Sequence, residues 1–202
     1  MNKSKKVLSK IKEEKLIVMG GRELKNLNIE PLSIAKFFYE KGAKNIALIQ
    51  RLIYLAFLKV LKEKNALLFN KEWQAWSGGP VIESVFQPMS EHLDKYDCNY
   101  EKLFASIPHT KNKEILQSLE EIYNDYQDYK KDRKEFVFFD KALGKPWQIA
   151  RYGLIYELDY QKIKLSDIVD YINQEKLEKE IKAFQSLSIP KQEWIIEYRQ
   201  YG

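Results

Sequence analysis

Apolar side chains recur at helical spacing along most of the chain, and two segments carry the clearest pattern. Over residues 46–61 they cover nearly every face of a helix, which is typical of a helix buried in a core. Over residues 114–133 they recur at three- and four-residue intervals, which predicts an amphipathic helix of about five turns. Asn45 directly precedes the first segment and is a favourable N-cap. We therefore expect a fold built around the helix at 46–61.

Shorter apolar patterns predict further helices. Ser33 is placed as the N-cap of a helix over residues 33–39, and Gly42 as its C-terminal stop. Ser166 is placed as the cap of residues 167–172. Residues 136–139 are apolar and short, so the pattern alone does not separate helix from strand; we favour a helix. A turn at 144–147 leads into residues 148–151, and further helices are expected at 175–187 and after Pro190.

Between these helices the spacing changes to alternation. A turn-forming pair lies within residues 69–73, and Trp73 and Ala75 alternate with polar neighbours, which predicts a small β-hairpin. Residues 96–113 are polar and irregular, so we expect a loop there.

A further helix is expected to begin directly after Gly78-Gly79. Pro80 suits the first helical position, and Glu83 is favourable near the positive end of a helix. Pro88 should bend or end this helix. Taken together, the elements predict a mainly α fold: a single compact helical domain around a buried central helix, with a small β-hairpin.

Composition narrows the class of protein. A hydrophobic content of 45% with 31% charged residues excludes a disordered chain. No apolar run reaches the roughly 20 residues of a membrane-spanning helix, and the N-terminus lacks a signal-peptide core. The single cysteine, Cys98, cannot form an internal disulfide, which fits a reducing compartment. We therefore expect a cytoplasmic protein that does not enter a membrane.

The net charge of +5 leaves two interpretations of the N-terminus open. Its excess lysines are Lys3, Lys5, Lys6, Lys10, Lys12 and Lys15. They form either a solvated tail or an arm that binds nucleic acid through phosphate contacts, as a regulator would. Across the whole chain, however, the basic residues are mostly lysines dispersed among 29 acidic ones, which weakens the argument from charge.

Residues suited to catalysis or metal binding are sparse. His92, His109 and Cys98 lie apart in polar sequence, so surface positions are expected for the histidines and no metal site, cofactor or catalytic residue is predicted. Gly78-Gly79 at a helix start would offer backbone N–H groups to a phosphate, which leaves a phosphate-using enzyme as an alternative. Neither nucleotide-binding fingerprint is present, and Pro80 removes one donor.

Several motifs occur in a recognisable order. They are IQRLIYLA at 49–56, LFN at 68–70, EWQAWSGGPV at 72–81, Pro146-Trp147, and the start of a helix at 165–172. In this order they resemble the Panacea, or antitoxin SocA-like, domain, formerly called a phage-associated protein family. The match runs over residues 33–174. Residues 1–30 are then expected to be a basic N-terminal extension, and residues 175–202 a C-terminal helical extension.

The chain departs from the family pattern at two places. Arg51 stands where the family usually has a lysine, which keeps the charge but changes its geometry. Residues 140–145 lack the Thr-His pair that often precedes Pro-Trp, so no role of that histidine is carried over.

The resemblance implies an antitoxin, and not an enzyme, that neutralises a cognate protein toxin by direct binding, either alone or as an adaptor for an ATP-dependent protease. The paired tryptophans are either core anchors or interface contacts. We predict partner contacts at Trp73, Trp76, Glu83 and Arg151. The motif positions predicted to hold the fold are Gln50, Arg51, Tyr54, Ala75, Gly79, Pro80, Val81, Pro146 and Trp147.

Overall fold

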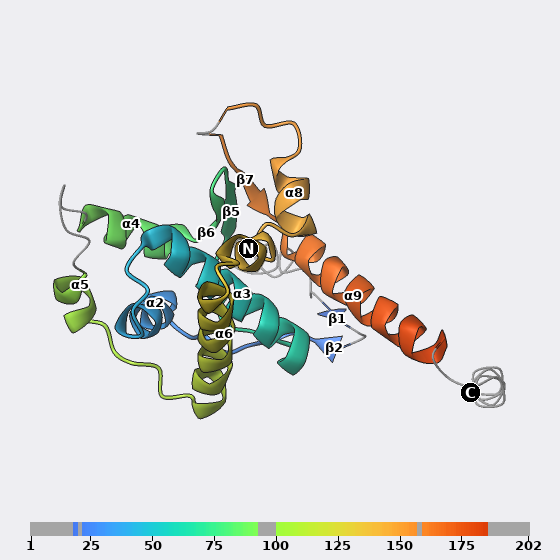
Figure 1. Cartoon of the computed structure of the whole chain (residues 1–202), viewed down its shortest axis with the longest axis horizontal. Coiled ribbons are helices and arrows are strands. Elements are labelled where there is room, and N and C mark those ends of the chain that lie inside the picture. The colour runs from blue at the N-terminus through green and yellow to red at the C-terminus, as the bar shows by residue number, and fades with distance from the viewer. Residues whose placement is uncertain (1–17, 20–21, 93–99, 157–158, 186–202) are drawn as a thin grey trace, which may run out of the picture.

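The most apolar segment of the chain forms α3 (Ile46–Lys64), around which the other elements pack in the computed structural model (Figure 1). The structure describes residues 18–19, 22–92, 100–156 and 159–185. The other helices described are α2 (Pro31–Glu40), α4 (Glu83–Glu91), α5 (Glu101–Ala105), α6 (Lys113–Lys131), α7 (Glu135–Asp140), α8 (Lys145–Arg151) and α9 (Leu165–Gln185). The strands described are β1 (Val18–Met19), β2 (Arg22–Glu23), β3 (Lys25–Asn26), β4 (Ala66–Leu67), β5 (Trp73–Trp76), β6 (Gly79–Val81) and β7 (Gln161–Ile163).

Helix α3 begins where its sequence predicts and continues three residues beyond the predicted segment 46–61. The Asn45 side chain accepts a hydrogen bond from the Leu48 N–H at 3.2 Å and so caps the helix. Asn65 takes a left-handed conformation (φ 51°), which ends it. Helices α2, α4 and α6 pack against α3, and most of its side chains are buried. The predicted fold class, mainly α around a buried central helix, is confirmed.

Two helices each begin two residues earlier than predicted. Helix α2 begins at Pro31 with Glu30 as its N-cap, because proline favours the first helical turn; the Ser33 hydroxyl instead donates to the Glu30 carbonyl at 2.7 Å. Helix α9 begins at Leu165, before the predicted cap Ser166, since the Lys164 carbonyl already accepts from the Ile168 N–H at 3.2 Å.

A β-hairpin is present, but it lies later in the chain than predicted. Strands β5 and β6 pair antiparallel around a turn at Ser77-Gly78, whereas the turn was expected within residues 69–73. Pro80 belongs to β6 and not to a helix. Strand β6 is an edge in the order β6-β5-β7, and an edge tolerates a residue without an N–H.

Helix α4 therefore starts at Glu83 and continues through Pro88 to Glu91, so the predicted termination at this proline is wrong. The segment predicted as a loop at 96–113 includes α5, whose Phe104 is buried and so holds the helix against the core. Strand β7 was not predicted; it pairs with β5.

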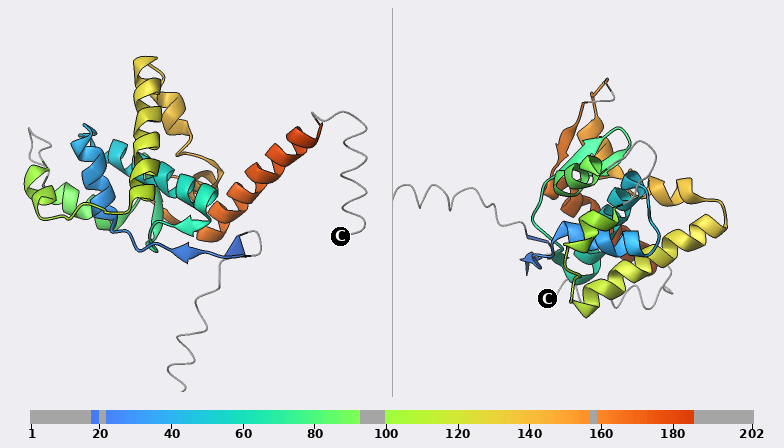
Figure 2. Two further views of the ribbon diagram at one scale, coloured as in Figure 1. Left: turned by 90° about the horizontal axis from the view of Figure 1, so that it is seen from below. Right: turned by 90° about the vertical axis from the view of Figure 1, so that its left-hand side faces the viewer.

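The structure describes part of each predicted terminal extension. Strand β3 pairs in parallel with β4, and the N–H groups of Leu27 and Ile29 donate to the carbonyls of Leu67 and Leu68, each at 2.8 Å. Residues 25–29 are thus joined to the core and are not a loose arm. At the other end, α9 is continuous across the predicted boundary at residue 174, and its C-terminal half extends away from the other helices (Figure 2).

Some predicted features lie outside the described residues: the lysines at positions 3–15, Cys98, and the last helix after Pro190. Among the helices that are described, none is both long and apolar enough to cross a membrane.

Candidate functional site

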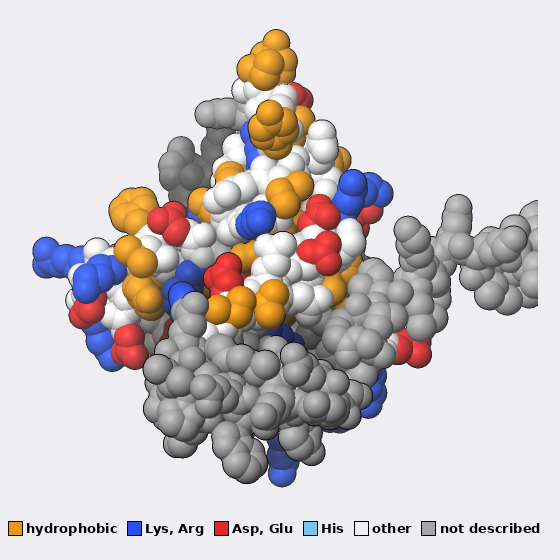
Figure 3. Space-filling view, turned by 90° about the vertical axis from the view of Figure 1, so that its right-hand side faces the viewer, with side chains coloured by type: hydrophobic (Ala, Val, Ile, Leu, Met, Phe, Trp, Pro, Cys, Tyr) orange, Lys and Arg blue, Asp and Glu red, His pale blue; other side chains and the backbone are white. Residues whose placement is uncertain are grey.

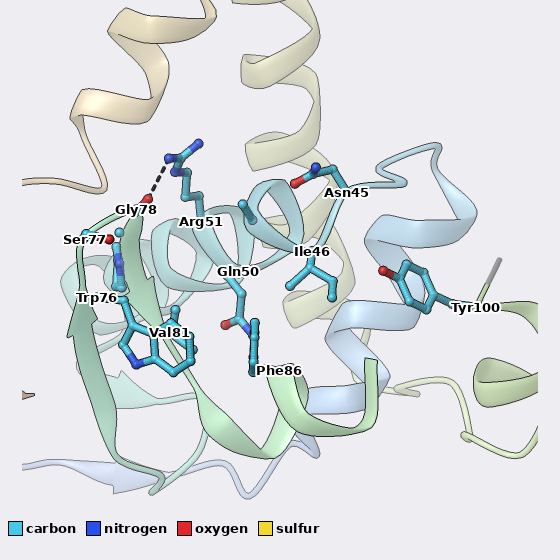
Figure 4. Close-up of a pocket in the computed structure, with 13 residues that line it drawn as sticks. Asn45, Ile46, Gln50, Arg51, Trp76, Ser77, Gly78, Val81, Phe86 and Tyr100 are labelled. Atoms are coloured by element: carbon cyan, nitrogen blue, oxygen red, sulfur yellow. Dashed lines mark hydrogen bonds between the residues drawn. The ribbon is translucent and has the colours of Figure 1, made fainter. Parts of the chain in front are cut away.

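The hairpin is attached to α3 by two neighbouring polar side chains. The Gln50 amide accepts from the Ile82 N–H at 3.0 Å and donates to the Ile82 carbonyl at 3.2 Å, so it pairs with the backbone as a strand would. The next residue, Arg51, donates through Nη2 to the Gly78 carbonyl at 2.6 Å (Figure 4). Its guanidinium also lies 4.6 Å from the centre of the Phe139 ring.

Gly79 is required here by its backbone conformation. Its φ is +133°, which side-chain-bearing residues rarely adopt, whereas a Cβ there would meet Arg51 Nε at 3.4 Å, an ordinary van der Waals distance.

Strand β5 separates its two tryptophans by the alternation of side chains along a strand. Trp73 is 2% exposed and its ring packs edge-on against Tyr54, with centroids 4.9 Å apart. It is a core residue and offers no surface to a partner, so we withdraw the prediction of a partner contact at Trp73. Trp76 is half-buried and faces the other side of the sheet, with Gln74.

Two of the other predicted contact residues are connected through Gln74. The Trp76 Nε1–H donates to Gln74 Oε1 at 2.7 Å, and the Gln74 amide donates to Glu83 Oε2 at 3.2 Å. Gln74 is only 5% exposed. It was not predicted, because a polar residue in an alternating strand pattern is expected on the solvent side.

Arg151 is joined to the same strand from α8. Its Nη1 donates to the carbonyls of Ala75, at 3.5 Å, and Asp159, and its Nη2 donates to the Tyr156 carbonyl at 3.4 Å. Nearby, the Trp147 Nε1–H donates to the Trp76 carbonyl at 2.9 Å, while Pro146 is buried in the first turn of α8. The structure therefore brings Trp76, Glu83 and Arg151 together around β5.

The end of α8 and the described residues of the loop that follows it, to which Arg151 donates hydrogen bonds, carry exposed apolar side chains. We call this set the apolar ridge: Ile149, Tyr152, Ile155, Tyr156 and Tyr160, which are 50%, 89%, 87%, 70% and 50% exposed. In a space-filling view, hydrophobic side chains gather at the end of the molecule formed by this loop (Figure 3). The sequence analysis missed the ridge, although four of its members lie within nine residues around Gly153.

Beneath the hairpin lies a cavity of about 340 Å³. Its walls come from the start of α3, the β5–β6 hairpin, Phe86 of α4 and Tyr100 (Figure 4). The apolar lining side chains include Ile46, Ala47, Trp76, Val81 and Phe86, and the polar ones include Gln50 and Arg51.

Burial shifts the pKa of two motif residues, Arg51 and Tyr54. Desolvation lowers the pKa of Arg51 and raises the pKa of Tyr54 well above its ordinary value, with a further rise from Tyr171. Desolvation and a hydrogen bond to Glu175 raise the pKa of Tyr171 to about 12. In the described part of the chain the Tyr54 hydroxyl has no hydrogen-bond partner.

The predicted surface positions of the histidines are confirmed. His92 Nδ1 lies 2.8 Å from the Pro88 carbonyl, and His109 Nε2 lies 3.0 Å from the Glu40 carboxylate; both residues are exposed. Within the described ranges, no group of three or more His, Cys, Asp or Glu side chains could hold a metal ion. Gly78-Gly79 forms the end of a hairpin and not the start of a helix, which removes the basis for the predicted phosphate alternative.

Comparisons with known protein families, with curated proteins and with solved structures found no match for this chain.

Proposed function

We propose that this chain is a cytoplasmic antitoxin that neutralises a cognate protein toxin by binding it through the apolar ridge and Trp76. The observation that carries the proposal is the exposure of the ridge. Contiguous exposed apolar side chains are uncommon on proteins that bind nothing, and tyrosine is enriched at the centres of protein interfaces. The motif resemblance to SocA-like antitoxins supports the kind of partner, and such a role requires no catalytic step by this chain.

The ridge is held in place before a partner arrives. Arg151 bonds to two carbonyls of the loop and to Ala75 of the sheet, and the Tyr160 ring stacks on Trp76 with centroids 5.8 Å apart. A surface that is ordered in advance loses less conformational entropy on binding, which favours affinity. The loop is thus suited to be a binding surface.

The test is co-expression with the product of each adjacent gene. The chain should relieve the toxicity of one neighbour and co-purify with it. Substituting Ile155→Ser together with Tyr156→Ser should weaken this binding by at least about tenfold, as expected for residues at the centre of an interface. The matched control is Phe136→Ser with Val137→Ser on α7, two apolar residues that are 83% and 51% exposed outside the ridge.

The proposal fails if no neighbour is neutralised, or if the ridge variant binds the toxin as well as the control does. Repeating the neutralisation in cells that lack ATP-dependent proteases separates the two modes of action. Direct inhibition persists in those cells, whereas an adaptor that delivers the toxin for degradation loses its effect.

A further inference from the structure

The cavity beneath the hairpin has an apolar lining with one charge. Of its lining residues that the structure describes, Arg51 alone bears a charge, and none is a carboxylate. Its volume of about 340 Å³ is at the lower end of the range of about 300–1,000 Å³ for ligand pockets. Such a space suits a side chain and its immediate neighbours better than a large cofactor.

Only some of the hydrogen-bond donors of the Arg51 guanidinium have a partner among the described residues. One nitrogen, Nη2, donates to the Gly78 carbonyl, but Nε is buried and has no hydrogen-bond partner among the described residues. Burial lowers the pKa of this guanidinium, because its charge is poorly solvated. A carboxylate brought to the cavity would therefore gain a charge-assisted interaction that the protein does not itself supply.

One side chain, Trp76, belongs to the wall of the cavity and also contacts the apolar ridge. Its ring packs against Phe86 in the cavity wall, with centroids 4.7 Å apart, and stacks on Tyr160 of the ridge. A partner that covers the ridge around Tyr160 is therefore separated from the cavity by a single side chain. Interfaces of this kind often have one apolar side chain inserted into a pocket next to the main contact.

We infer that the cavity receives an apolar side chain, flanked by a carboxylate that pairs with Arg51, from the partner that covers the ridge. This inference rests on the proposed function for the identity of the partner. The occupant is a segment of the partner polypeptide, because the cavity adjoins the protein-binding surface and its one charge requires an acidic complement.

The cavity can be closed without removing any of its polar contacts. Ala47 is exposed on the first turn of α3 and lines the cavity, so Ala47→Leu fills it with a residue that favours helices. The control is Ala105→Leu, an exposed alanine on α5 that does not line this cavity. We expect Ala47→Leu to weaken toxin binding at least about tenfold and Ala105→Leu to leave it unchanged. Equal binding by both variants overturns the inference while leaving the proposed function standing.

A small probe tests the same chemistry without a toxin. 3-Phenylpropionate carries an apolar group and a carboxylate, and 3-phenylpropionamide is its neutral match. By saturation-transfer NMR, the acid should bind the free chain more tightly than the amide, and Ala47→Leu should abolish this binding. Arg51→Gln should remove the preference for the acid. Equal binding of acid and amide, or binding that survives Ala47→Leu, overturns the inference.

The two experiments together distinguish the source of the occupant. The acid should compete with the toxin for the wild-type chain, because both need the cavity. If the acid binds in the cavity but does not displace a bound toxin, the site takes a free small acid and the assignment to a partner segment is wrong. If no neighbour is bound at all, the proposed function fails, and the assignment to a partner segment fails with it whatever the probe does.

Discussion

At the scale of single residues, polar side chains hold the hairpin in position beside α3. Gln50 is 2% exposed, and both the oxygen and the nitrogen of its side-chain amide form hydrogen bonds with the backbone of Ile82. A hydrophobic residue of similar size would fill the same space but would leave the Ile82 N–H unpaired. The buried amide therefore fixes the position of the hairpin on α3 more specifically than an apolar contact would.

The first prediction is that Gln50→Leu lowers the free energy of unfolding by about 1–3 kcal/mol, the cost of a buried donor without a partner. The Ile82 carbonyl keeps its bonds from the Val85 and Phe86 N–H groups, so only the N–H is orphaned. Chemical denaturation measures the change. Gln87→Leu, at an exposed position of α4, is the control and should stay within about 0.5 kcal/mol of the wild type.

The second prediction concerns pH. Since the pKa of Tyr54 is raised in the folded chain, the unfolded chain loses this proton first, near its ordinary value of about 10. The stability due to neutral Tyr54 is therefore complete below about pH 10 and is lost as the pH rises above it. Tyr54→Phe should lose less stability than the wild type between about pH 9 and pH 11.

Denaturation at several pH values measures this difference. The control is Tyr152→Phe, at a tyrosine that is 89% exposed, and it should follow the wild-type curve. A Tyr54→Phe curve parallel to that of the wild type above pH 10 would contradict the explanation from burial.

At the scale of elements, the hairpin depends on backbone conformation as much as on pairing. Its two central glycines are not equivalent. A Cβ at Gly79 would lie 3.4 Å from Arg51 Nε and 3.6 Å from Leu143 Cδ2, and the φ of +133° is strained for any side chain. A Cβ at Gly78 would meet nothing within 4 Å.

The third prediction is that Gly79→Ala destabilises the chain by about 1–3 kcal/mol, the usual cost of a residue held in such a conformation. Gly78→Ala is the matched control and should change the stability by less than about 0.5 kcal/mol. Melting temperatures of the two variants check this. Equal effects of the two substitutions would mean that the φ angle of Gly79 is not a constraint in solution.

At the scale of the whole molecule, segments far apart in the chain pair as strands and cover each other's apolar surface. Strand β7 joins the hairpin from beyond α8, and residues 25–29 lie along β4. Leu24, Leu27 and Ile29 are partly buried against the core. The domain therefore begins before the helix at residue 31, because these side chains cover apolar surface that would otherwise face water.

The fourth prediction follows from this packing. A chain that begins at Glu23 should melt at a higher temperature than one that begins at Pro31, because only the first keeps β3 and the backbone bonds of Leu27 and Ile29 to residues 67 and 68. The comparison concerns residues 23–30 alone. Identical melting temperatures would show that β3 adds nothing to the stability of the domain.

The local pattern was sufficient for some features of the fold. The start and burial of α3 and the amphipathic α6 were predicted, since their periodicity and caps act over a few neighbouring residues. At α7 the short apolar run favoured a helix but did not by itself exclude a strand. The same pattern placed a hairpin near Trp73 but misplaced its turn. Turn position depends on which strands pair, and β5 pairs on both sides with partners that the local sequence does not reveal.

The candidate site depends on tertiary packing more than the helices of the fold do. Sequence spacing placed Trp73 and Trp76 together, yet one is in the core and the other lies between the cavity and the ridge, because a strand sends alternate side chains to opposite faces. The exposure of Tyr152 and Ile155 could not be read from their apolar character, which by itself predicts burial. Which apolar residues remain exposed to solvent depends on how many the core can accommodate. That number depends on how the helices and strands pack together.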